Sequence, residues 1–131
     1  MNYILDTSVL VGYLRNVEKW IELLLSFKPD ELEISIITYA ELLYGVARAI
    51  NPQKEEEKLK ALISGLDIEI TTITEDISRI YAQARVFLEK RGERLDNFDL
   101  LIGATAVVGS SVLVTDNIAH FKRFPGIRLY K

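Results

Sequence analysis

Four acidic positions spread over the chain have the residue types and settings that suit chemistry. Asp6 directly follows a short apolar run, Asp116 follows another one after Thr115, Glu41 lies near the start of a helical stretch, and Asp99 leads into a strongly apolar one. Carboxylates brought together repel one another unless a cation neutralises them. Hard divalent ions such as Mg²⁺ or Mn²⁺ prefer these oxygen ligands. We therefore predict a metal site formed by Asp6, Asp99, Glu41 and Asp116, with Asn117 as an alternative for the last position.

Such a site needs no side-chain nucleophile. The ion lowers the pKa of a bound water and clamps the attacking and leaving oxygens of an in-line displacement at phosphorus. The chain has no cysteine and a single histidine, His120, which excludes disulfides, thiolate metal sites and relays of two histidines. We expect His120 to be a surface or turn residue. The chemistry indicated is hydrolysis of a phosphodiester.

Each acidic residue also has a purely structural explanation. Asp6 can cap the helix that follows it. The spacing Thr38-Tyr39-Ala40-Glu41 is that of a capping box, which explains Glu41 without any function. Asp99 can favour the helix N-terminal dipole, although Asp96 or Asn97 can already cap that helix.

The remaining polar residues near these positions have similar explanations. Asp116 and Asn117 can form an Asx turn. The hydroxyls of Thr7, Ser8 and Thr115 are expected to serve as caps rather than as ligands.

Apolar runs and helical periodicities alternate along the chain, which predicts a mostly parallel sheet with helices on both faces. If strands 3–5, 32–37 and 112–114 are parallel neighbours, the acidic residues meet at the sheet edge where ligands bind. The expected strands are 3–5, 32–37, 66–70 (short or at an edge), 112–114 and 127–130, and the expected helices are 9–14, 18–27, 38–49, 53–64, 74–91 and 96–108, with a short helix or turn near Phe121.

Length and composition set the remaining limits. We expect one domain across residues 1–131, with 49% hydrophobic and 27% charged residues. No stretch approaches the ~20 apolar residues of a membrane span, so we expect a soluble cytoplasmic protein. The net charge of −3 argues against a broadly basic nucleic-acid surface. A local strip of Arg85, Lys90, Arg91 and Arg94 either holds a phosphate chain or is simply a solvated helix end.

Four stretches, in their order and spacing, resemble PIN-domain ribonucleases, specifically the VapC toxins of VapBC toxin–antitoxin pairs. They are Leu5–Ser8, Thr38–Gly45, Phe98–Ala106, and Val114–Asn117 followed by Phe121. No single stretch is specific, but together they span the chain. The resemblance implies a three-layer α/β/α PIN-like domain, RNA cleavage with Mg²⁺ or Mn²⁺, frequent homodimerisation, and inhibition by a small antitoxin protein.

The resemblance also implies roles for individual residues. Asp6, Glu41 and Asp99 fall on the family's acidic positions. The family's last position falls on Asn117, and Asp116 is the intervening residue. Asp6 and Asp99 would then hold the principal cation, Glu41 would help bind it or orient the water, and Asp116 or Asn117 would complete the site.

Three other functions match parts of the same pattern. A phosphatase with Asp6 as nucleophile requires a second carboxylate two residues later and a lysine late in the sheet. This chain has Ser8 at the first of these positions, and no lysine lies at the second. A receiver-like phosphoacceptor fails similarly, because Lys122 lies too far beyond the last buried strand. A catalytically degenerate domain that binds RNA or a protein partner stays open because Asn117 adds no charge, and divalent-ion binding distinguishes it.

Overall fold

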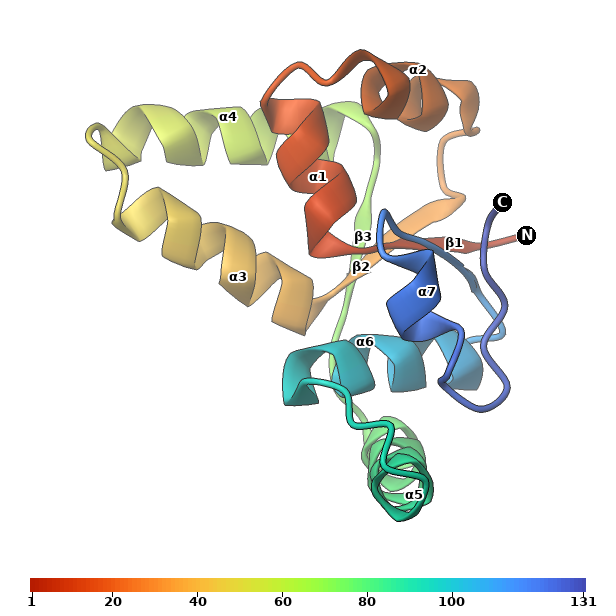
Figure 1. Ribbon diagram of the computed structural model, residues 1–131. Coiled ribbons are helices and arrows are strands. Elements are labelled where there is room, and N and C mark those ends of the chain that lie inside the picture. The colour runs from red at the N-terminus through yellow and green to blue at the C-terminus, as the bar shows by residue number, and fades with distance from the viewer.

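A four-stranded, fully parallel sheet lies at the centre of the computed structural model, which describes residues 1–131 (Figure 1). The spatial order of the strands is β3-β2-β1-β4. The strands are β1 (Tyr3–Leu5), β2 (Leu32–Ser35), β3 (Glu69–Thr71) and β4 (Val112–Val114). The helices are α1 (Thr7–Leu14), α2 (Glu18–Ser26), α3 (Ile36–Ala47), α4 (Pro52–Gly65), α5 (Glu75–Lys90), α6 (Asn97–Val108) and α7 (Ile118–Phe121).

Strand β1 holds the middle of the sheet. Tyr3 pairs with Leu32 of β2 on one side and with Val112 of β4 on the other. The prediction that these three strands are parallel neighbours is confirmed. The carboxyl ends of β1 and β4 therefore meet, because Leu5 lies opposite Val114 in the register.

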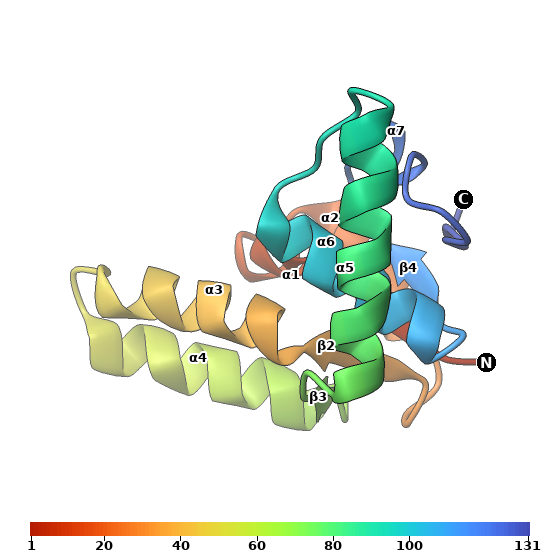
Figure 2. The ribbon, with the colours of Figure 1, turned by 90° about the horizontal axis from the view of Figure 1, so that it is seen from below.

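Helices cover both faces of the sheet, as a three-layer α/β/α arrangement requires. Successive side chains of a strand point to opposite faces. Leu5 packs in a core cluster with residues of α1 to α4, whereas Ile4 packs with Ile102 of α6 and Phe121 of α7. Figure 2 shows α5 along the outer side of α6, and α3 beside α4 as a helical hairpin. The predicted fold class is confirmed. No helix is both long enough and apolar enough to cross a membrane.

Helix α6 is buried on most of its surface, as its small apolar residues predicted. The closest approach is at Gly103, where a Cβ atom would lie 2.7 Å from Cδ2 of Phe124. Any larger side chain at this position would therefore force a shift, because the aromatic ring of the C-terminal segment occupies the space that its Cβ atom would fill.

The start of α3 differs from the prediction. Strand β2 ends at Ser35 rather than at residue 37, and the Ser35 hydroxyl caps the helix by accepting from the Ile37 N–H at 3.0 Å. Thr38 and Glu41 lie inside the helix, so the predicted capping box is wrong. The serine hydroxyl supplies the cap three residues earlier, which leaves the Glu41 carboxylate free for another contact.

Two other predicted strands are shifted or shortened. The third strand covers 69–71 instead of 66–70, because Leu66 caps α4 and Asp67 turns with a φ of 52°. It does lie at the sheet edge, as predicted. The last strand, 127–130, is reduced to a single parallel bridge between Leu113 and Leu129.

Candidate active site

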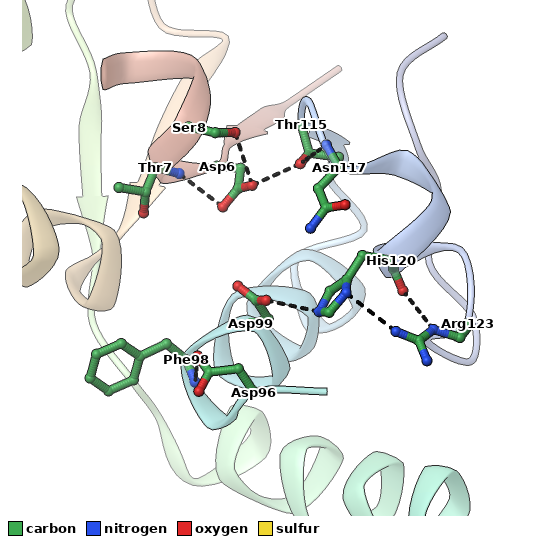
Figure 3. A network of polar contacts seen from close by, with 10 residues as sticks. All are labelled: Asp6, Thr7, Ser8, Asp96, Phe98, Asp99, Thr115, Asn117, His120 and Arg123. Carbon is green, nitrogen blue, oxygen red and sulfur yellow. Dashed lines mark hydrogen bonds and ion pairs between the residues drawn. The ribbon is translucent and has the colours of Figure 1, made fainter. Parts of the chain in front are cut away.

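Asp6 lies at the carboxyl end of β1 and is also the N-cap of α1. The residue is 7% exposed, and its carboxylate accepts three hydrogen bonds (Figure 3). The Thr7 N–H donates to Oδ1 at 2.9 Å, and the hydroxyls of Thr115 and Ser8 donate to Oδ2 at 2.7 and 3.2 Å. Capping and site formation are therefore not alternatives here. The hydroxyls expected to be caps fix the orientation of a buried carboxylate instead.

Glu41 faces α1 from inside α3. The Thr7 hydroxyl donates to Glu41 Oε1 at 2.6 Å and lies 3.4 Å from the hydroxyl of Thr38. Thr7 thus contacts the Asp6 carboxylate through its N–H and the Glu41 carboxylate through its hydroxyl. This residue links two of the predicted acidic positions.

Asp99 lies in the first turn of α6 without serving as its cap. Asp96 is the cap and accepts from the Phe98 N–H at 3.2 Å. Burial, followed by the charge of Asp6, raises the pKa of Asp99 to about 6, while the neighbouring His120 ring acts in the opposite direction. Figure 3 shows the Asp6 and Asp99 side chains directed into the same space. Two carboxylates therefore share a site with an unbalanced negative charge.

His120 was not recognised from the sequence as a site residue. Its Nε2 lies 3.1 Å from Asp99 Oδ2, and its side chain is only 29% exposed. The expectation of a surface or turn residue is therefore wrong. The available signal was its position three residues after Asn117, on the short helix α7 that follows the loop.

Asp116 and Asn117 diverge in the loop after β4. The Asp116 side chain is 58% exposed and pairs with Lys19 of α2 at 3.3 Å. The Asn117 N–H donates to the Thr115 hydroxyl at 2.9 Å, and its side-chain amide points into the space bounded by Asp6, Asp99 and His120 (Figure 3). Of these two residues, Asn117 is the one directed toward the other site residues.

The basic residues of α5 and the following loop are largely engaged with their neighbours. Arg85 donates to Tyr81 and Glu89, and Arg91 pairs with Glu93 at 3.4 Å. The structure brings none of these residues into a contact with the acidic site. Their role in holding a phosphate chain stays a prediction.

A groove of about 800 Å³ opens beside the acidic site, between α1, α3 and α4. Most of its lining is apolar, and Thr7, Glu41 and the half-exposed Phe98 lie at its border with the site. The acidic site therefore continues into an extended surface depression rather than standing alone.

The donor set fits a divalent cation bound through few protein ligands. No three acidic or histidine side chains lie close enough together to share one ion. However, Mg²⁺ commonly uses one or two carboxylates and keeps several waters. The facing carboxylates of Asp6 and Asp99 meet this requirement. Burial, and after it the charge of Asp6, raises the pKa of Asp99, and a bound cation would offset both effects.

Residues 3–127 match the PIN domain family. The chain belongs to the PIN-domain family. Similar PIN proteins include ribonuclease VapC2 of Rickettsia felis, which is 34% identical over 98% of this chain and 96% of its own length. The tRNA(fMet)-specific endonuclease VapC of Salmonella typhimurium is 27% identical over 98% of this chain and 96% of its own length. The matches thus cover nearly the whole length of this chain and of each relative.

Solved PIN-domain structures share the fold closely. VapBC2 from Rickettsia felis, bound to a DNA fragment from its promoter, has a chain that superposes with a TM-score of 0.88 at 32% identity, covering 99% of this chain and 98% of its own. VapBC from Salmonella typhimurium, also DNA-bound, has a chain that gives a TM-score of 0.91 at 26% identity. The match covers 99% of this chain and 97% of that one. The fold implied by the sequence resemblance is confirmed.

Proposed function

We propose that this PIN-domain protein is a VapC-type endoribonuclease, the toxin of a toxin–antitoxin pair, that hydrolyses RNA phosphodiester bonds with a divalent cation. The observation that carries the proposal is the pair of carboxylates, Asp6 and Asp99, that face one space. Burial, followed by the charge of Asp6, raises the pKa of Asp99 to about 6. The names of relatives that match over nearly the whole chain support the reaction class.

Asp6 and Asp99 would hold the cation, which we take to be Mg²⁺ or Mn²⁺. When bound, the ion supplies charge stabilisation at phosphorus and lowers the pKa of a coordinated water. Asp6 is held in place by three donors, so its free lone pairs have a fixed direction. Glu41 is oriented through Thr7 at the border of the groove, where it can accept a proton from water.

We assign the fourth position to Asn117 rather than Asp116. Lys19 holds the Asp116 carboxylate at the surface, whereas the Asn117 amide points toward the other site residues. An amide oxygen orients a water or binds a cation without adding charge. The net charge at the site is then lower than four carboxylates would give.

The partners we propose are an RNA substrate, a small antitoxin and a second copy of this chain, all in the cytoplasm. The antitoxin is supported by the similar structures, which are VapBC complexes. The alternative function is a degenerate PIN module that binds RNA or a protein without cleavage. It is favoured by the absence of any cluster of three metal-coordinating side chains.

The test is cleavage of a panel of purified RNAs with Mg²⁺, with Mn²⁺, or with a chelator. We expect cutting by the wild-type chain only with a cation, and none by Asp6→Asn or Asp99→Asn variants that retain their circular dichroism. Asp116→Asn is the matched control, because it removes one charge from a carboxylate that Lys19 holds outside the site. Undiminished cleavage by Asp6→Asn would sink the proposal. Divalent-ion-independent RNA binding without cleavage would favour the degenerate module.

A further inference from the structure

His120 lies between an acidic and a basic neighbour, each of which contacts a different ring nitrogen. Nε2 lies 3.1 Å from Asp99 Oδ2, and Nδ1 lies 3.2 Å from Arg123 Nη2 (Figure 3). Arg123 is itself held in place, because its Nε donates to the His120 carbonyl oxygen at 3.3 Å. The guanidinium thus has two contacts with one residue, which fixes its position relative to the ring.

The chemistry of Arg123 determines the form of the ring. A guanidinium has only N–H donors and stays protonated in proteins, so the Nδ1 atom that it contacts must act as an acceptor. In the neutral ring, the single proton is then on Nε2. Nε2 is buried, and Asp99 Oδ2 is the acceptor that it faces, although the contact falls short of regular hydrogen-bond geometry.

We propose that His120 is a positioning residue: Arg123 fixes it as the Nε2–H tautomer, and this N–H holds Oδ2 of Asp99 so that the other carboxylate oxygen is presented to the cation. Ligands of metal ions are commonly oriented by such outer partners. The cation part of this inference rests on the proposed function. The tautomer part does not.

A neutral donor suits this position better than a charged one. A lysine or a second arginine against Asp99 would neutralise the negative charge that attracts a cation. The neutral imidazole orients the carboxylate and leaves its charge intact. Simple packing of the ring against Phe121 would explain its burial, but would not require Arg123 on one ring nitrogen and Asp99 opposite the other.

The tautomer can be measured without any metal, because His120 is the only histidine of the chain. Protein labelled with ¹⁵N-histidine gives one set of ring signals in a long-range ¹H–¹⁵N correlation spectrum at pH 8. We expect a protonated Nε2 and an unprotonated Nδ1 in the wild type. In Arg123→Ala, both nitrogen shifts should move toward those of a free ring. A protonated Nδ1 in the wild type would overturn the inference.

The effect on Asp99 is measured as Mn²⁺ affinity by calorimetry, with thermal unfolding of every variant as a check on folding. His120→Ala should weaken Mn²⁺ binding by about 10- to 100-fold. His120→Gln should restore most of the affinity, because its amide nitrogen reaches the position of Nε2. Arg123→Ala as a single substitution should weaken Mn²⁺ binding, but it should cause no further loss of affinity in a protein that already carries His120→Ala. Lys122→Ala, which removes an equal charge next to Arg123, is the control.

The outcomes separate the two proposals. If His120→Ala binds Mn²⁺ as well as the wild type does, or if Lys122→Ala weakens binding as much as Arg123→Ala does, His120 does not position Asp99 and the inference is overturned. If the wild type binds no Mn²⁺, the cation of the proposed function is refuted, and with it the role of His120 toward that cation. The metal-free spectrum still decides the tautomer in that case.

Discussion

Replacing Asp99 with asparagine is expected to stabilise the metal-free protein at neutral pH. Burial and the charge of Asp6 raise the pKa of Asp99 from 3.8 to about 6. A shift of one pKa unit corresponds to about 1.36 kcal/mol, so this rise corresponds to about 3 kcal/mol of destabilisation when the Asp99 carboxylate is ionised. The side chain is 26% exposed, so solvent screening reduces the expected value to about 2 kcal/mol.

The destabilisation caused by ionised Asp99 depends on pH. The folded protein binds the Asp99 proton more tightly than the unfolded chain does, so the penalty is absent below pH 4, grows between pH 4 and 6, and is complete above pH 6. Asparagine carries no charge at any of these pH values. The difference in unfolding free energy between Asp99→Asn and the wild type should therefore rise from near zero at pH 4 to about 2 kcal/mol at pH 7.

Urea unfolding followed by the fluorescence of Trp20, the only tryptophan, measures this difference between pH 4 and 8. Asp116→Asn is the control and should show no such pH-dependent gain, because that carboxylate lies at the surface beside Lys19. Millimolar Mg²⁺ should stabilise the wild type at pH 7 and leave Asp99→Asn almost unchanged. A difference that is flat with pH, or an Asp99→Asn variant less stable than the wild type at pH 7, would refute the reasoning.

Two further predictions concern the packing around the site. Thr115→Val removes the hydroxyl that donates to Asp6 Oδ2 at 2.7 Å, and should cost about 1–3 kcal/mol in urea unfolding and weaken Mn²⁺ binding; an unchanged unfolding midpoint would contradict this. Gly103→Ala places a Cβ atom 2.7 Å from the Phe124 ring and should cost about 1–3 kcal/mol. Gly45→Ala, in a helix with nothing within 4 Å, is its control and should gain about 0.5–1 kcal/mol; equal effects of the two alanines would refute the packing argument.

The sequence predicted the parts of the site that follow from local rules. Asp6 ends an apolar run at the sheet edge where ligands bind, and Asp99 follows residues that already cap its helix, so both stood out as candidate site residues. The parallel order of β1, β2 and β4 followed from the alternation of strands and helices. These features need only periodicity and capping to be recognised.

The features that the sequence did not reveal depend on contacts between distant segments. Glu41 was predicted as a site residue with a capping box as the alternative, because Thr38 has the right spacing; the structure shows that Ser35 provides the cap and that Thr7 contacts the carboxylate. The surroundings of His120 exist only after α7 has packed beside α6. No periodicity or spacing encodes that contact, so a lone histidine in a turn was the natural but wrong expectation.

The place of β1 in the middle of the sheet has a consequence for the timing of synthesis. Asp6 is translated 109 residues before Thr115, the hydroxyl that holds it, and β1 gains its second neighbour only when β4 is available. A growing chain therefore carries Asp6 without the Thr115 hydroxyl while most of the polypeptide is being made. We therefore expect any cleavage activity to begin only after β4 has emerged from the ribosome and paired with β1.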